Sequence, residues 1–406
     1  MSVLLALGFR PFFLLAGFLA VVLIATWVPV FVDGVAFSSY YGQLGWHSHE
    51  MIFGYAVAVI AGFLLTAVRN WTERPTPAGG YLAVMVALWL FGRILPFFPA
   101  VVPNWFIALV DLAFLPAVAV GIGIPLMRSG ESRNLLFLPL LAALWTANFF
   151  VHAELIGWVP NLARKGIFLG LDLIVLLIVI MGGRVIPFFT ERALPGIVMK
   201  RWSIIEWLSP LSVLMFLLAD FLFADSLLSA SLAILAACAN GIRLAGWYTH
   251  RYWRVPLLWI LHLGYGWIGA GFVLKVAAAF GAVPPQFTVH AFTVGGIGVL
   301  TLGMMARVSL GHTARPLHIG SAMAVAFGLV NLSAVTRGLL PILLPEWFSR
   351  LIVVSGVLWV GAFVLLCLKI FSICANHATK AVSFSVLALR AANNAVMTFR
   401  PFSVTT

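Results

Sequence analysis

Charged residues are scarce in this sequence. They make up 9% of its 406 residues, far below the roughly 25% that is usual in globular chains, whereas 63% of the residues are hydrophobic. Together with a mean hydropathy of +1.10, this composition excludes a cytosolic enzyme, a disordered chain and a secreted disulfide scaffold. It predicts a polytopic membrane protein.

Cysteines and phosphate-binding loops are also lacking. The three cysteines, Cys238, Cys367 and Cys374, are scattered within apolar runs. This placement is typical of small buried hydrophobic residues and argues against disulfides, a cysteine-ligated copper pair or covalent haem attachment. The sequence holds no GxxxxGK[ST] loop, which disfavours ATP-driven transport by this chain alone.

Long apolar runs fill the chain instead. A membrane-spanning helix needs about 20 mostly apolar residues, and twelve such segments predict an all-α transmembrane protein. They are expected at residues 12–32, 49–68, 81–98, 105–127, 135–153, 166–186, 204–223, 227–247, 256–280, 288–308, 318–340 and 350–374. We expect residues 1–375 to form one transmembrane domain and residues 376–406 to form a cytoplasmic tail.

Lysine and arginine concentrate on one side of these spans. Because both accumulate in cytoplasmic loops, a layout with both termini in the cytoplasm places 18 of the 24 on the inner side and six outside or in outer halves. The six are Arg93, Arg164, Lys165, Lys275, Arg337 and Arg350. The net charge of +12 therefore reports orientation in the lipid bilayer, and we expect no nucleic-acid partner.

Three histidines share one depth at the outer side. His47 and His49, followed by Glu50, open the second span, and His290 opens the tenth. Residues two apart on a helix point about 200° from one another, so we expect one of the pair, most simply His49, to face His290 across the bundle. Two imidazoles from different helices commonly hold b-type haem. The alternative is that these histidines are interfacial caps or hydrogen-bonding groups.

The inner side carries a second pair of histidines. His262 lies inside the ninth span, and His312 follows the tenth and could approach it, which would make an inner metal site. His290 and His312 are about 33 Å apart along one helix and cannot share a metal. In the outer thirds, Asp172 and Lys275 come at similar depth and could form an ion pair, either as structural neutralisation or as a proton relay.

The inner ends of the second, sixth and tenth spans share a pattern. Each has a small or apolar run that meets an arginine, at Arg69, Arg184 and Arg307 respectively. With twelve helices, this pattern indicates a faint repeat of three four-helix units. The orientation rule alone also places arginines at these ends.

Several sequence blocks, in order from about residue 5 to residue 320, resemble the NnrS family. They are Gly8-Phe9-Arg10-Pro11-Phe12-Phe13, Trp46-His47-Ser48-His49-Glu50-Met51, Gly62-Phe63-Leu64-Leu65-Thr66-Ala67-Val68, Gly182-Gly183-Arg184-Val185-Ile186-Pro187, Leu261-His262-Leu263-Gly264-Tyr265 and Ala306-Arg307-Val308-Ser309-Leu310-Gly311-His312-Thr313.

The resemblance implies a bacterial inner-membrane protein that contains haem and copper and is associated with denitrification and resistance to nitric oxide. It marks five candidate metal ligands, His47, His49, His262, His290 and His312. It does not fix a reaction, and a nitric oxide-linked oxidoreductase with an unidentified electron donor is one interpretation.

A looser parallel exists with haem-copper oxidases and nitric oxide reductases. These also use twelve helices in three four-helix arcs, with haem histidines on the second and tenth helices, where His49 and His290 lie here. The sixth span has Asp172 and no histidine, and the seventh and eighth lack a histidine pair. A direct copy of that binuclear centre is therefore not expected.

These observations favour an integral-membrane protein with haem b and copper that binds or turns over nitric oxide or a related nitrosyl species and relieves nitrosative stress. His49 and His290 would bind haem axially, and His47 would supply a second metal or a hydrogen bond. Arg184 and Arg307 would pair with haem propionates or with anions such as nitrite, or would only anchor the inner helix ends.

The alternative from another class is a proton-coupled secondary transporter without haem. Twelve helices with both termini inside are common among such carriers, and Asp172, Lys275 and Arg93 would then take part in proton or substrate coupling.

Overall fold

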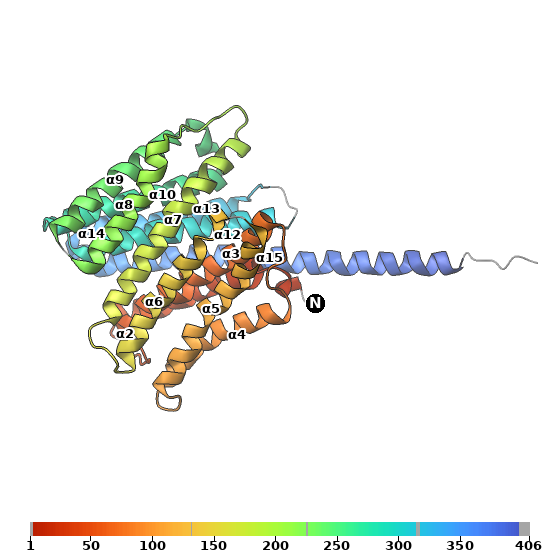
Figure 1. The fold of residues 1–406 in the computed structure, drawn as a ribbon, viewed down its shortest axis with the longest axis horizontal. Helices are drawn as coiled ribbons and strands as arrows, with labels where there is room; N and C mark the ends of the chain where they lie inside the picture. The colour runs from red at the N-terminus through yellow and green to blue at the C-terminus, as the bar shows by residue number, and fades with distance from the viewer. Residues whose placement is uncertain (1–2, 131, 225, 314–316, 398–406) are drawn as a thin grey trace, which may run out of the picture.

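The computed structural model describes residues 3–130, 132–224, 226–313 and 317–397, with side chains described as far as Ile373. It is an all-helical bundle, and twelve of its helical segments are long and apolar enough to cross a membrane (Figure 1). The predicted class and number of spans are therefore confirmed. The candidate spans are Phe9–Val32, Gly42–Thr72, Gly80–Phe97, Asn104–Ser129, Ser132–Leu155, Ala163–Ala193, Ser203–Leu222, Leu227–Gly246, Pro256–Ala279, Pro285–Gly311, Ser321–Leu343 and Pro345–Ile373.

Most spans are single α-helices. The first span and the third to ninth spans contain, in order, α1 (Phe9–Val32), α4 (Gly80–Ile94), α5 (Asn104–Ser129), α6 (Phe137–Leu155), α7 (Ala163–Ala193), α8 (Ser203–Leu222), α9 (Leu227–Gly246) and α10 (Pro256–Ala279). The last two spans contain α13 (Ser321–Gly338) with α14 (Leu340–Leu343), and α15 (Phe348–Met397).

The second and tenth spans are each interrupted by a π-helical segment. The second consists of α2 (Gly42–His49), the π-helix η2 (Glu50–Ala56) and α3 (Val57–Thr72). The tenth consists of α11 (Pro285–His290), the π-helix η6 (Ala291–Gly298) and α12 (Val299–Gly311). His49 and His290 therefore occupy the same place, directly before a π-helix, and such segments are frequent at functional sites. The sixth span, α7, is α-helical throughout, so the three-unit repeat stays a prediction.

The first and last membrane spans pack against each other. Helix α15 packs against α1 and α13, and Trp359 on α15 donates a hydrogen bond of 3.0 Å to the carbonyl oxygen of Ala20 on α1. Figure 1 shows α15 continuing well beyond the other helices. The division at residue 375 stays a prediction, and residues 398–406 of the expected tail lie outside the described residues.

Glycines let buried polar side chains lie against α7. A Cβ at Gly183 would come within 1.8 Å of Nη2 of Arg243, and one at Gly182 within 2.9 Å of the Tyr265 ring. The space is used by Arg243, which donates to the Val179 carbonyl oxygen at 2.9 Å and is ion-paired with Glu206. The Gly-Gly-Arg block is thus explained by close packing of α7 against α9 and α10.

The ion pair considered between Asp172 and Lys275 is not found among the described residues. Lys275 Nζ instead lies 2.8 Å from Oδ1 of Asp220 on α8, and this carboxylate also accepts a 2.7 Å hydrogen bond from Ser229. Asp172 is buried close to both charges. Depth alone did not distinguish the two aspartates, because both lie near the same end of the bundle.

Candidate metal centre

Three ligand-type side chains meet inside the first half of the bundle. His49 ends α2, Asp111 lies on α5 and His152 lies near the end of α6. One ligand atom from each lies within 4.8 Å of those of the other two. The exposed fractions are 0% for His49, 5% for Asp111 and 0% for His152. Such burial of ionisable groups in a membrane-spanning bundle is costly, which makes this group a candidate functional site.

Asp111 is the hub of this group. One carboxylate oxygen accepts hydrogen bonds from Asn148 Nδ2 at 2.8 Å and from His152 Nε2 at 3.0 Å, and it lies 3.4 Å from His49 Nε2. The other oxygen pairs with the guanidinium of Arg93 on α4. The carboxylate is therefore held by three other helices besides its own.

Arg93 connects this carboxylate to a second one. Its Nε lies 2.8 Å from Oε2 of Glu50, the first residue of the π-helix η2. Two glycines leave room for these acids, because a Cβ at Gly92 would come within 2.7 Å of Asp111 and one at Gly54 within 2.6 Å of Glu50. The interruption of the second span therefore places Glu50 inside the bundle, where Arg93 compensates its charge.

The contacts determine where the protons lie. The side-chain amide nitrogen of Asn148 donates a hydrogen bond to Asp111. Its Oδ1, which is 2.9 Å from Nε2 of His49, must therefore accept a hydrogen bond from that ring. The other nitrogen of His49, Nδ1, lies 3.1 Å from Oε1 of Glu50. An imidazole between two acceptors carries both protons. Two carboxylates, Arg93 and a cationic His49 then give a neutral group.

Two tyrosines cover the group from the segment before α2. Tyr40 lies 3.2 Å from Nδ1 of His152 through its hydroxyl, and burial raises the pKa of this hydroxyl above its usual value of 10. Tyr40 therefore keeps its proton, and when the His152 ring is neutral, with its proton on Nε2, this hydroxyl donates to Nδ1. The Tyr41 ring stacks on His49 at 4.1 Å, and its buried hydroxyl has no hydrogen-bond partner.

Comparison with known families agrees with the sequence blocks. The sequence model of the NnrS protein family matches residues 3–377. The chain belongs to the NnrS family. A search of curated proteins finds no match. NnrS membership and the twelve candidate spans together establish a multi-pass membrane protein of this family.

The outer histidines predicted for this NnrS chain fall into two groups. His49 belongs to the buried group with Asp111, whereas His47 stacks on Trp27 at 4.4 Å and has Arg337 and His290 as electrostatic neighbours. Nδ1 of His47 is buried without a hydrogen bond. Nδ1 of His290 donates to the carbonyl oxygen of Gln286 at 2.7 Å. The structure thus brings His290 near His47, and the expected pairing with His49 stays untested.

The two inner histidines lie in different surroundings. His262 donates through Nδ1 to the Leu258 carbonyl oxygen at 3.0 Å and stacks on Tyr252 at 4.1 Å. His312 packs against Phe9, and its Nε2 is 3.5 Å from the amide nitrogen of Asn70. Between these two histidine side chains, both among the described residues, the structure shows no hydrogen bond or ring contact.

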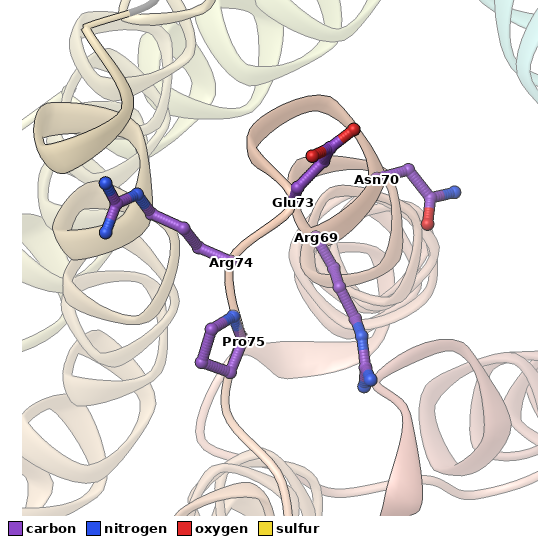
Figure 2. Close-up of a pocket in the computed structure, with 5 residues that line it drawn as sticks. All are labelled: Arg69, Asn70, Glu73, Arg74 and Pro75. Carbon is purple, nitrogen blue, oxygen red and sulfur yellow. The ribbon is translucent and has the colours of Figure 1, made fainter.

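Asn70 also lines a surface pocket at the end of α3. The other lining residues are Arg69, Glu73, Arg74 and Pro75. Figure 2 shows the two arginine side chains pointing away from one another, so they do not form a paired cationic site. The pocket is about 30 Å along the second span from His49, which separates it from the buried group.

The two predicted arginines also differ. Arg184 donates to Asn134 Oδ1 at 3.0 Å. Arg307 is buried, with its guanidinium carbon 3.8 Å from the centre of the Phe189 ring. These contacts account for both as packing groups at helix ends, and their expected role toward propionates or anions stays a prediction.

Sequence analysis missed Asp111 and His152 as partners of His49. Asp111 and His152 lie in the fourth and fifth predicted spans, toward the same side as His49 in the predicted topology, and this shared depth was the available signal. Depth could not show that α5 and α6 lie beside His49.

Proposed function

We propose that this NnrS-family protein is a haem- and copper-containing protein of the bacterial inner membrane that binds or turns over nitric oxide or a related nitrosyl species. In this role it relieves nitrosative stress. The observation that carries the proposal is the buried group of His49, Asp111 and His152, with ligand atoms within 4.8 Å of one another. Family membership supports the choice of haem and copper as the cofactors.

The buried group has the donor chemistry of a transition-metal site. Two imidazoles and one carboxylate suit copper, and also zinc and iron(II). A cation also fits the charges of the group, because a metal on Nε2 of His49 would replace the proton that this nitrogen now donates to Asn148. Tyr41 adds an orphaned hydroxyl beside this group, which supports a missing ligand or metal-bound water.

The neighbouring residues would tune such a site. Glu50 holds Nδ1 of His49 and would orient the ring, so that Nε2, which lies beside Asp111, would be the ligand atom. Tyr40 would fix His152 through Nδ1. Partners of this kind set the tautomer and the basicity of a ligating histidine. When bound, copper would supply a redox-active position to which nitric oxide can bind.

For haem, His47 and His290 fit better than the predicted pair of His49 and His290. His49 belongs to the proposed copper group with Asp111 and His152, whereas His47 lies outside that group and has a buried nitrogen without a partner. His290 donates Nδ1 to a backbone carbonyl, which leaves Nε2 for a metal, the usual arrangement of a ligating histidine. Haem bound there would add iron chemistry at the same depth as the copper group.

The test is a reduced pyridine-haemochrome spectrum with metal analysis on the detergent-purified protein, followed by titration with nitric oxide. We expect haem and copper in the wild type and a spectral change on adding nitric oxide. His290→Ala should lose haem and keep copper, His152→Ala should do the reverse, and His262→Ala should keep both. A folded protein that is colourless and free of metal would contradict the proposal and favour the transporter alternative.

A further inference from the structure

Arg337 is a half-buried cation that has no counter-ion among the described residues. It lies near the end of α13, within a candidate span, and its Nη1 is buried and forms no hydrogen bond. Its ring contact is with Phe348, whose centre is 5.7 Å from the guanidinium carbon. Among the described residues no carboxylate pairs with it. A guanidinium in this position retains the cost of burial without the compensation of an anion.

Other buried cations at the same end of the bundle are compensated. Arg93 pairs with Glu50 and Asp111, and Lys275 pairs with Asp220. At this end of the bundle the two cations have carboxylate partners and, within the part of the chain that the structure describes, Arg337 has none. Arg307, near the opposite end, also has no carboxylate partner among the described residues, but none of its nitrogens is both buried and without a hydrogen bond.

A second orphaned nitrogen lies beside Arg337. His47 on α2 has Nδ1 buried without a partner, and its ring is held by parallel stacking on Trp27. Helix α11, which carries His290, packs against α13, which carries Arg337, and His47 and His290 are both within electrostatic range of Arg337. Two unsatisfied nitrogens from two different spans are the mark of a ligand that the chain does not itself provide.

We propose that Arg337, beside His47, binds a planar anion that presents two oxygens. A guanidinium matches such a group with parallel N–H donors. Nδ1 of His47 adds a further donor when the anion is free and no haem is bound, and is the proposed iron ligand when haem is bound. A carboxylate side group of haem and free nitrite share this shape and charge. The haem source rests on the proposed function, whereas the anion site itself does not depend on it.

The experiment compares Arg337→Gln and Arg337→Lys with the control Arg350→Gln. Arg350 also lies over an aromatic ring, that of Trp347 at 4.9 Å, but its side chain is exposed. Haem content and midpoint potential are measured on each purified protein. Haem-free protein, prepared from cells starved of haem, is then titrated with nitrite and with formate while its thermal midpoint is followed.

If haem supplies the anion, Arg337→Gln should retain haem at least about tenfold more weakly than wild type, because it loses the charge and the hydrogen bonds of a buried pair. Arg337→Lys should recover part of this and shift the midpoint potential, and Arg350→Gln should behave as wild type. If the anion is free, nitrite and formate should raise the thermal midpoint of the wild type and not of Arg337→Gln.

The outcomes separate the two proposals. A protein without haem that is stabilised by nitrite supports the anion site while contradicting the haem assignment. Haem binding that is unchanged in Arg337→Gln, together with no stabilisation of the wild type by nitrite or formate, overturns the anion site and leaves the haem assignment standing. If Arg337→Gln fails to fold, Arg337→Lys supplies the comparison of haem binding, and the titration of wild-type protein decides the free anion.

Discussion

Replacing Asp111 with asparagine removes the charge that holds the buried group together. The carboxylate accepts from Asn148 and His152 and pairs with Arg93. In Asp111→Asn, whichever way the new amide is turned, its NH2 group faces an N–H donor. Arg93 would keep Glu50 as its remaining partner, through the 2.8 Å contact at Nε.

The size of the effect follows from these contacts. Breaking a buried ion pair by removing one partner costs about 3–5 kcal/mol. The surviving Glu50 contact reduces the electrostatic part of this loss, while the new donor–donor contacts increase it. Using 2–4 °C per kcal/mol, the thermal midpoint should fall by roughly 6–20 °C.

The assay is thermal unfolding of the detergent-purified protein, with Asp172→Asn as the matched control. Asp172 is buried to a similar degree, 7% exposed against 5%, but accepts no hydrogen bond from a described residue. Its neutralisation should therefore leave the midpoint unchanged or raise it, because a desolvated charge is removed. Equal losses in the two variants would refute the claim that Asp111 is a specific hub.

Three further predictions concern separate parts of the molecule. Gly183→Ala should lower the unfolding free energy by about 1–3 kcal/mol because the new Cβ displaces Arg243, whereas Gly241→Ala, with no atom within 4 Å of its Cβ, should be neutral or stabilising in the same unfolding assay. Tyr41→Phe should not destabilise metal-free protein, since the hydroxyl has no partner, but should weaken metal binding measured by competition with a chelator. Burial lowers the pKa of His312 below its usual 6.5, so the folded state disfavours its protonation; stability should decline as the pH falls below about 6.5, and a pH series of unfolding midpoints should show a smaller decline in His312→Gln.

Hydropathy was sufficient to predict the spans because each apolar run must cross the same bilayer thickness. It placed the start of the second span at residue 49, whereas α2 begins at Gly42. The segment from Gly42 to Ser48 is too polar to register as a membrane helix. It is helical because Trp46 is buried against the bundle and His47 stacks on Trp27 of α1.

The partners of the polar residues were predicted less well, for a common reason. An apolar sequence reports depth along the membrane normal and says little about which helices are neighbours. His49 and Lys275 lie at the same end of the bundle as the partners found for them, Asp111 and Asp220. Neither partner was predicted from the sequence. Lateral neighbours depend on packing between helices, including the space left by glycines such as Gly92, which no hydrophobic period encodes.

The two π-helices could not be predicted from the sequence. An inserted residue within a span changes the direction of every side chain before it relative to those after it. The argument that His47 and His49 point in different directions was sound, but which one faces the tenth span could not be obtained from ideal helix geometry.

The central claim is that His49, Asp111 and His152 form a metal centre. The most direct measurement is the copper content and electron paramagnetic resonance spectrum of oxidised protein, for the wild type and for His152→Ala. The account predicts copper in the same amount as protein, with coupling to imidazole nitrogen, and its loss from His152→Ala while haem remains. Copper retained unchanged in His152→Ala, or a folded wild type free of metal at this group, would contradict it.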